Sequence, residues 1–530
     1  MRIERHHIAT SPLADFPDRI GRQVHSYSRA GLMTSTEWQL ISDAFLDQLG
    51  ALSTSSPDLA SPEAKALLRD ASEAAAGAVS FAAYHPRDRF SVFLDYVNFG
   101  MSYDPDPTEA AAPPLSAQRW VNAFCLAVLT DTFDRHAEAF VFSGQALSPA
   151  SDLATALLSH LLPRVDSPSP ASDDPAFHAL HALRTGDRPA FDAAVLALLD
   201  RTDGTRPRTL LPLLPLALSA LAHRDHGWLP SIDTDYLPHS LVTRFATPER
   251  RPESMTWPVR VDRPTPPLPL HPDVEARFEQ AVRRGIDPSP DETHPVFELG
   301  RALEKQVRLF RTRASRAADV TEEQVADLRL ASEMGAALFR IALADPGTTV
   351  AVPLAGRTVH FPATCDEESW PGRWHLALNL ALITGSRDDL APLLLAGPTR
   401  SARDRSAYAD YRVALHDHLR GLDARPAVEK ARLEVARAQE WNFFPDSVGL
   451  LAQLVDGDET GFNLALLDTL EAHRDHYSVA DRATDPDAPL DLDVLALVCH
   501  ARRHHGWTVR VESPYLPARL LADHDSAHGL

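Results

Sequence analysis

Cysteine is scarce in this sequence: Cys125, Cys365 and Cys499 are the three in 530 residues, and no two lie close together. This distribution excludes a disulfide framework and a Cys-x-x-Cys metal or redox motif, and it fits a reducing compartment. Long apolar runs are also missing, since the longest, residues 209–222, is too short to span a bilayer and contains two prolines. Residues 1–13 lack the apolar run of a signal peptide. We therefore expect a cytoplasmic protein without a membrane segment.

An excess of basic charge and the common catalytic motifs are missing as well. The sequence has no Walker loop and no GxGxxG, HExxH or GxSxG motif, so we predict no enzymatic activity and no cofactor. The sequence has 52 basic and 73 acidic residues, which gives a net charge of −21 that is spread along the chain. Nucleic acids and anionic membranes bind to basic faces, so we expect neither as a partner. The acidic charge permits a basic protein partner.

One motif occurs twice. Residues 226–238 read HGWLPSIDTDYLP and residues 505–517 read HGWTVRVESPYLP, with glycine, tryptophan, tyrosine and proline at matching positions. Three further motif pairs recur in the same order, at residues 68–73 and 328–333, 120–134 and 374–388, and 186–191 and 457–462. A repeat of this length indicates a duplicated domain, because solenoid repeats are much shorter. We predict two diverged copies, residues 1–245 and 274–530, joined by an extended proline-rich linker over residues 246–273.

The periodicity of apolar residues predicts helices throughout both copies. Ser61-Pro62-Glu63 in the first copy and Thr321-x-x-Gln324 in the second are different signals for a helix start at the same place. Residues 348–361 of the second copy are typical of a small hairpin. The predicted fold class is all-α, with two tandem copies of a multi-helical domain that each contain a minor hairpin or short strand.

The repeated ending has two interpretations. As structure, Gly506 ends a helix, Trp507 packs over it and a short strand follows, and we favour this interpretation, with Trp228 and Trp507 mostly buried. As function, Trp507, Glu512 and Tyr515 form an exposed aromatic and acidic patch for protein recognition. The first copy has a proline and an aspartate in this segment, which weakens its strand.

Histidine-rich segments of the second copy allow a metal interpretation, in which His473-x-x-His476 approaches His500, His504 and His505. The alternative is that histidines near helix ends satisfy backbone carbonyls and the helix dipole. Two histidines on one helical face make a metal site only with a third ligand, and the first copy has aspartate where the second has His504. We therefore predict no metal.

The second copy resembles the immunity 49 family in four short stretches, residues 471–478, 495–497, 503–507 and 511–517. That family comprises mostly α-helical, predicted immunity proteins of bacterial polymorphic-toxin systems. The resemblance implies an immunity protein that neutralises a cognate toxin by non-covalent binding, and the charge suggests that this toxin is basic. The first copy lacks the His/Tyr loop and the Glu-Ser-Pro of these stretches, which points to a degenerate or structural copy.

The candidate binding residues come from these stretches: His473, His476, Tyr477, His505, Trp507, Glu512 and Tyr515. Two other function classes stay open: a helical interaction or regulatory scaffold without a toxin partner, and an enzyme whose histidines and carboxylates converge only in the fold. A deep pocket with convergent, perturbed acids would favour the enzyme. The sequence predicts neither the chemistry of the toxin nor an oligomeric state.

Overall fold

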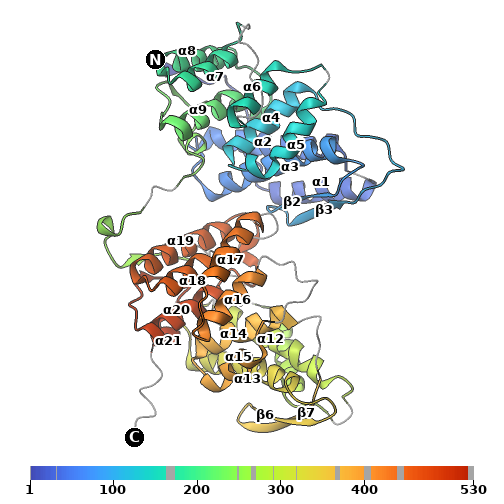
Figure 1. The fold of residues 1–530 in the computed structure, drawn as a ribbon, viewed down its shortest axis with the longest axis vertical. Helices are drawn as coiled ribbons and strands as arrows, with labels where there is room; N and C mark the ends of the chain where they lie inside the picture. The colour runs from blue at the N-terminus through green and yellow to red at the C-terminus, as the bar shows by residue number, and fades with distance from the viewer. Residues whose placement is uncertain are drawn as a thin grey trace. The chain divides into compact units, whose positions relative to one another are not determined.

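Helices dominate the part of the chain that the computed structural model describes (Figure 1), which confirms the predicted all-α class. The described part is the whole chain except residues 1, 32, 148, 163–172, 247–249, 264–269, 290–291, 315, 318, 365–369, 399–407, 439–446 and 523–530. The chain divides into two compact units, Met1–Pro248 (unit 1) and Glu249–Leu530 (unit 2). Among the described helices, none is long and apolar enough to cross a membrane.

Among its described residues, unit 1 consists of helices with two short strands near its ends and one hairpin. In chain order it contains β1 (Arg2–Ile3), α1 (Phe16–Ala30), α2 (Ser35–Ser55), α3 (Pro62–Tyr84), β2 (Phe90–Leu94), β3 (Phe99–Tyr103), α4 (Ala117–Leu129), α5 (Phe133–Gln145), α6 (Asp152–Leu161), α7 (Pro175–Thr185), α8 (Arg188–Leu199), the short turn η1 (Pro207–Leu210), α9 (Leu213–His226), β4 (Asp233–Thr234) and α10 (His239–Val242). The predicted cap at Ser61 is present, since its hydroxyl accepts from the backbone N–H of Ala64 at 3.2 Å.

Unit 2 is likewise built from helices, two short strands near its ends and one hairpin among its described residues. In chain order it contains η2 (Pro252–Ser254), β5 (Val259–Arg260), α11 (Pro272–Ile286), α12 (Pro295–Ala314), α13 (Glu322–Ala342), β6 (Thr349–Leu354), β7 (Arg357–Pro362), α14 (Trp370–Thr384), α15 (Arg387–Ala396), α16 (Tyr408–Leu419), α17 (Arg425–Ala438), α18 (Ser447–Asp456), α19 (Glu459–Tyr477), η3 (Arg482–Thr484), α20 (Leu492–His505), β8 (Val511–Glu512) and α21 (Ala518–Leu521). The predicted hairpin is β6 with β7, antiparallel from Thr349 opposite Pro362 to Leu354 opposite Arg357.

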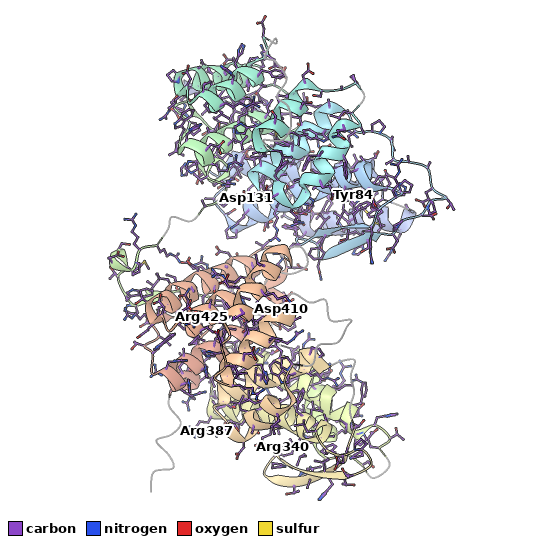
Figure 2. The ribbon with its side chains drawn as sticks, in the orientation of Figure 1. Tyr84, Asp131, Arg340, Arg387, Asp410 and Arg425 are labelled. Atoms are coloured by element: carbon purple, nitrogen blue, oxygen red, sulfur yellow. The ribbon has the colours of Figure 1, made fainter. Side chains whose placement is uncertain are left out.

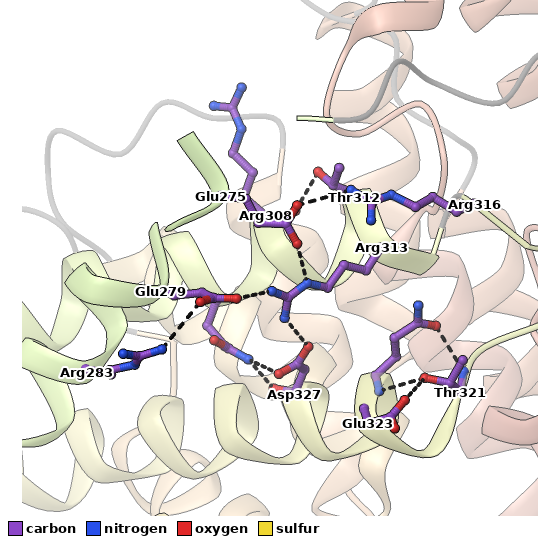
Figure 3. A network of polar contacts seen from close by, with 12 residues as sticks. Glu275, Glu279, Arg283, Arg308, Thr312, Arg313, Arg316, Thr321, Glu323 and Asp327 are labelled. Carbon is purple, nitrogen blue, oxygen red and sulfur yellow. Dashed lines mark hydrogen bonds and ion pairs between the residues drawn. The ribbon is translucent and has the colours of Figure 1, made fainter. Parts of the chain in front are cut away.

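The start of α13 is the predicted capping box, in which Thr321 and Gln324 bond each other's backbone N–H groups at 3.0 and 3.3 Å. Arg313 at the end of α12 then ties three helices together (Figure 3). Its guanidinium bonds Glu275 and Glu279 of α11 at 2.8 and 2.5 Å, and Asp327 of α13 at 2.8 Å. This guanidinium lowers the pKa of Glu275, so the network holds the charged forms of both groups.

In each unit a strand near its beginning pairs in parallel with a strand near its end. β1 pairs with β4 and places Arg2 opposite Asp233, while β5 pairs with β8 and places Arg260 opposite Glu512. The strands near the beginning of the two units have similar sequences, Arg2-Ile3-Glu4-Arg5 in unit 1 and Arg260-Val261-Asp262-Arg263 in unit 2. This pair is not among the repeated motifs predicted from the sequence.

The predicted linker over residues 246–273 therefore needs correction. Val261 is fully buried in the core of unit 2, and Met255, Trp257 and Val259 pack against the same core. These residues belong to unit 2 because the extended chain pairs with β8 and buries its apolar side chains, instead of spanning solvent as a free linker. Residues 247–249 and 264–269 of the predicted linker lie outside the described part of the chain.

Apart from η2 and α17, the described elements of unit 2 follow in the order of those of unit 1. The packing also corresponds, since α3 contacts α2, α4 and α5 as α13 contacts α12, α14 and α15, and α4 packs on α9 as α14 packs on α20. Trp120 of α4 and Trp374 of α14 are both fully buried, as predicted for central helices. We keep an internal duplication as our proposal for the origin of the two units.

Candidate functional site

Most of the predicted binding residues of unit 2 lie near the two ends of α20. The helix begins after Asp491, whose carboxylate accepts from the N–H groups of Asp493 and Val494 at 2.9 and 3.0 Å. It ends at Gly506, which has a φ of 70° and so adopts the left-handed conformation that favours glycine. A helix of 14 residues is about 21 Å long. Features at its two ends are therefore separate sites.

Near the beginning of α20, two predicted binding residues are part of the interior. His473 of α19 and Tyr515 are only 2% and 1% exposed, and their rings meet edge to face at 4.8 Å. The Nε2 atom of His473 lies 3.1 Å from the carbonyl oxygen of Ala488, and Tyr477 packs on the same imidazole at 4.6 Å. Burial lowers the pKa of His473. These groups hold the loop before α20 against α19, and a partner protein does not reach them directly.

A pair of carboxyl groups at the same end of α20 was missed in the sequence. Burial raises the pKa of both Asp491 and Asp493 to about 6, and each is further disfavoured as an anion by nearby carboxylates. From α14, Asn379 donates a hydrogen bond to Asp493, and the Nε2 atom of His375 lies 3.4 Å from the same carboxylate. Burial lowers the pKa of His375 to about 3. An aspartate just before the apolar run of residues 492–499 is a signal for a helix N-cap, but only the packing of α14 shows that the pair is partly buried.

The surface at this end is acidic. The acidic connection, which we define as residues 478–491 between α19 and α20, exposes Asp481, Asp485 and Asp487. Asp487 forms an ion pair with Arg311 of α12. The matching connection of unit 1, residues 200–212, contains more arginine than aspartate. The two units thus present opposite charge at corresponding places.

At the far end of α20, Trp507 follows the terminal glycine and packs on Phe462 at 5.5 Å and on His505 at 5.0 Å. Unit 1 repeats this arrangement with Trp228, which lies 5.9 Å from Phe191 and stacks on its own neighbouring histidine. Both glycines and both helix ends are therefore as predicted. Both tryptophans are of intermediate burial, in line with the prediction that they are mostly buried, although neither is fully buried. They cover the edge of the core because the chain leaves the helix at the surface.

Three imidazoles gather at this far end. His418 from the end of α16 and His500 and His505 from α20 each have a ring nitrogen within 4.8 Å of one in the other two rings. The Nε2 atoms of His500 and His505 are buried and have no hydrogen-bond partner in the described structure. Burial and the neighbouring imidazoles lower the pKa of His418 to about 4 and that of His500 to about 3. These rings are therefore neutral at neutral pH.

Comparison with known proteins identifies the family. The family model described as Immunity protein 49 matches residues 172–241 of unit 1 and residues 315–520 of unit 2, more than half of the chain. The chain belongs to the Immunity protein 49 family. No curated protein and no solved structure matches it. The match confirms the resemblance seen in the second copy, and it also includes α7 to α10 of unit 1.

In this Immunity protein 49 member, the exposed patch of Trp507, Glu512 and Tyr515 is not formed. Glu512 is exposed on β8, where it lies opposite Arg260 of β5, but Tyr515 points into the core and Trp507 is partly covered. The metal interpretation is also wrong about which histidines lie together. His473 lies beside the beginning of α20, whereas His505 is the last residue of this helix and His500 lies near its end.

The remaining predicted residue, His476, lies on the surface side of α19, where its Nδ1 atom is 3.1 Å from the guanidinium of Arg482. It is partly exposed, as is Tyr477. Both residues adjoin the acidic connection. Of the predicted set, His476, Tyr477 and Glu512 thus stay accessible to a partner, together with the edges of Trp507 and His505.

Elsewhere in unit 2, a cavity of about 660 Å³ opens between α13, the β6–β7 hairpin and α15, with Arg340 on its wall (Figure 2). Two of its lining carboxylates, Glu333 and Asp389, have structural partners. Glu333 accepts from the N–H of Ala355 at 2.8 Å, and Asp389 accepts from the hydroxyl of Ser332 at 2.8 Å. These bonds hold the hairpin and α15 on α13, so we assign the carboxylates a structural role.

Proposed function

We propose that this protein is a cytoplasmic immunity protein that neutralises a cognate toxin by direct non-covalent binding. The observation that carries the proposal is the match to the Immunity protein 49 family over both units. The absence of common catalytic motifs in the sequence agrees with an action by binding rather than by catalysis.

The acidic connection of unit 2 is the surface that we propose for the first contact with the toxin. Three aspartates are exposed there within seven residues, and His476 and Tyr477 lie at its edge. A basic toxin would be attracted to this surface, and complementary charge mainly raises the rate of association. The matching connection in unit 1 lacks the acidic excess, so we propose that unit 2 makes this contact.

A carboxylate-dependent enzyme is the second candidate, and one observation favours it. Asp491 and Asp493 lie partly buried beside one another, Asp493 next to His375, and their raised pKa values are typical of groups that transfer protons. Asp493→Asn separates the candidates, because it removes the proton-transfer group and changes only a partly buried side chain outside the acidic connection. An enzyme would lose its protective effect, whereas a binding protein would keep it.

The test is co-expression with the toxin encoded beside this gene, followed by size-exclusion chromatography of the purified pair. We expect rescue of growth and a stable complex. Replacing Asp481 and Asp485 by asparagine should slow association about tenfold at low salt, and added salt should reduce the difference. The matched control replaces Asp200 and Asp203 in the corresponding connection of unit 1, and it should associate at the original rate. Failure to rescue growth and to form a complex would refute the proposal.

A further inference from the structure

Two of the three imidazoles, His418 and His505, have histidine counterparts in unit 1, and those counterparts have oxygen partners, whereas His500 stands where unit 1 has Leu221. In unit 1, His226 occupies the position of His505, and its Nε2 atom lies 2.8 Å from the carbonyl oxygen of Leu183. His160, at the end of α6, has its Nε2 atom 2.9 Å from Asp225. Both of these unit 1 rings, His160 and His226, thus have an oxygen partner.

Among the described residues of unit 2, no such oxygen contact is made by the Nε2 atoms of His500 and His505. The position of Asp225 is taken by His504, so the end of α16 meets imidazoles instead of a carboxylate. The Nε2 atoms of His500 and His505 are buried without a partner among the described residues. A buried polar atom without a partner costs free energy and calls for an explanation, and a bound ion is one.

From this geometry we propose that His418, His500 and His505 bind one divalent transition-metal ion, with Zn²⁺ as the first choice. Neutral imidazole is a good ligand for zinc, nickel and copper, whereas calcium and magnesium prefer oxygen, which this cluster does not offer. Zinc is held by imidazole nitrogens at about 2.0–2.1 Å, which places tetrahedral ligands about 3.3 Å apart. Nitrogens that already lie within 4.8 Å of one another reach that spacing by small side-chain rotations.

The helices also favour a cation at this place. His418 is the penultimate residue of α16, and His505 is the last residue of α20, so two helix C-termini with their partial negative charge converge on the cluster. The nearby Arg503 is directed elsewhere, since its guanidinium donates to the carbonyl oxygens of Leu382 and Leu520 at 2.7 and 2.8 Å. A metal ion at this point would join α16 to the turn that carries Trp507.

The test uses the full chain without an oligohistidine tag, stripped of metal by a chelator and titrated with Co²⁺ and then Zn²⁺. We expect one Co²⁺ per chain with the strong visible absorption of tetrahedral cobalt, displacement by Zn²⁺, and a higher unfolding temperature with metal. His418→Gln, His500→Gln and His505→Gln should each weaken binding at least about tenfold. Circular dichroism checks that each variant is folded.

Two matched controls distinguish this site from the other histidines of the chain. His504→Gln changes an exposed neighbour on the same helix, and His226→Gln changes the counterpart of His505 in unit 1. Both variants should bind cobalt like the original chain. The proposal is overturned by an absence of saturable binding, by the weak spectrum of octahedral cobalt, or by three ligand variants that all bind cobalt as tightly as the original chain. None of these outcomes bears on toxin binding, so this proposal and the proposed function are tested separately.

Discussion

Replacing Asp491 by asparagine should stabilise unit 2 at neutral pH but not at acidic pH. The carboxyl is buried, and its pKa is raised from the ordinary value of 3.8 to about 6. A change of this size corresponds to about 3 kcal/mol against the ionised form. Because 10% of the side chain is exposed and can be hydrated, we expect a gain of about 1–3 kcal/mol. Asparagine is as good an N-cap as aspartate, so the start of α20 is retained.

The difference in the free energy of unfolding between the variant and the original chain should depend on pH. Below pH 4 the carboxyl is protonated in both the folded and the unfolded chain, so the variant and the original chain should be equally stable. Between pH 4 and about 6 the folded chain holds the proton more tightly, and the stability of the original chain falls as the pH rises. Above this range the full difference is present. The variant lacks this loss.

Urea unfolding at a series of pH values from 4 to 8, followed by circular dichroism, measures the difference. Asp458→Asn is the matched control, because Asp458 caps the neighbouring helix α19 in the same way but is exposed. The control should not be more stable than the original chain at neutral pH. A difference between Asp491→Asn and the original chain that stays constant from pH 4 to 8 would refute the reasoning, as would a loss of stability at pH 7.

Three further predictions concern packing and charge. Gly50→Ala should destabilise unit 1 by about 1–3 kcal/mol, because the new Cβ would lie 2.1 Å from a backbone oxygen of η1. Gly21→Ala, with nothing within 4 Å, should instead gain up to about 1 kcal/mol; chemical denaturation compares the two. Trp507→Ala and Trp228→Ala should each cost about 2–3 kcal/mol, less than a core tryptophan, and equal thermal shifts would fit their matching packing. Arg313→Met should cost about 2–4 kcal/mol at low salt, since it leaves three carboxylates together; an unchanged urea midpoint would contradict this.

The features that the sequence predicted well are those that neighbouring residues determine. The capping box at Thr321, the cap at Ser61 and the terminal glycines at 227 and 506 each depend on a few consecutive residues. Such signals can be recognised without knowledge of the fold, because the hydrogen bonds involved form within a single turn. The hairpin of residues 349–362 belongs to the same class.

The features that the sequence did not predict depend on packing between distant segments. His418 lies more than eighty positions before His500, and only the contact of α16 with the end of α20 brings them together. The burial of Tyr515 requires α19 on one side of it, and the pKa of Asp493 requires α14. Strand β5 was hidden among prolines, because a two-residue strand has no periodicity to detect.

The differences between the two units indicate which part of the protein has a specialised function. Where unit 1 pairs His160 with Asp225, unit 2 has imidazoles, and where unit 1 bonds His226 to a carbonyl, His505 has no such partner. The connection before α20 is acidic, while its counterpart before α9 is not. Since α9 and α20 pack on equivalent helices, the requirements of the fold alone do not explain these differences. They all surround α20, so we expect substitutions there to alter partner or metal binding, and the same substitutions around α9 to alter stability alone.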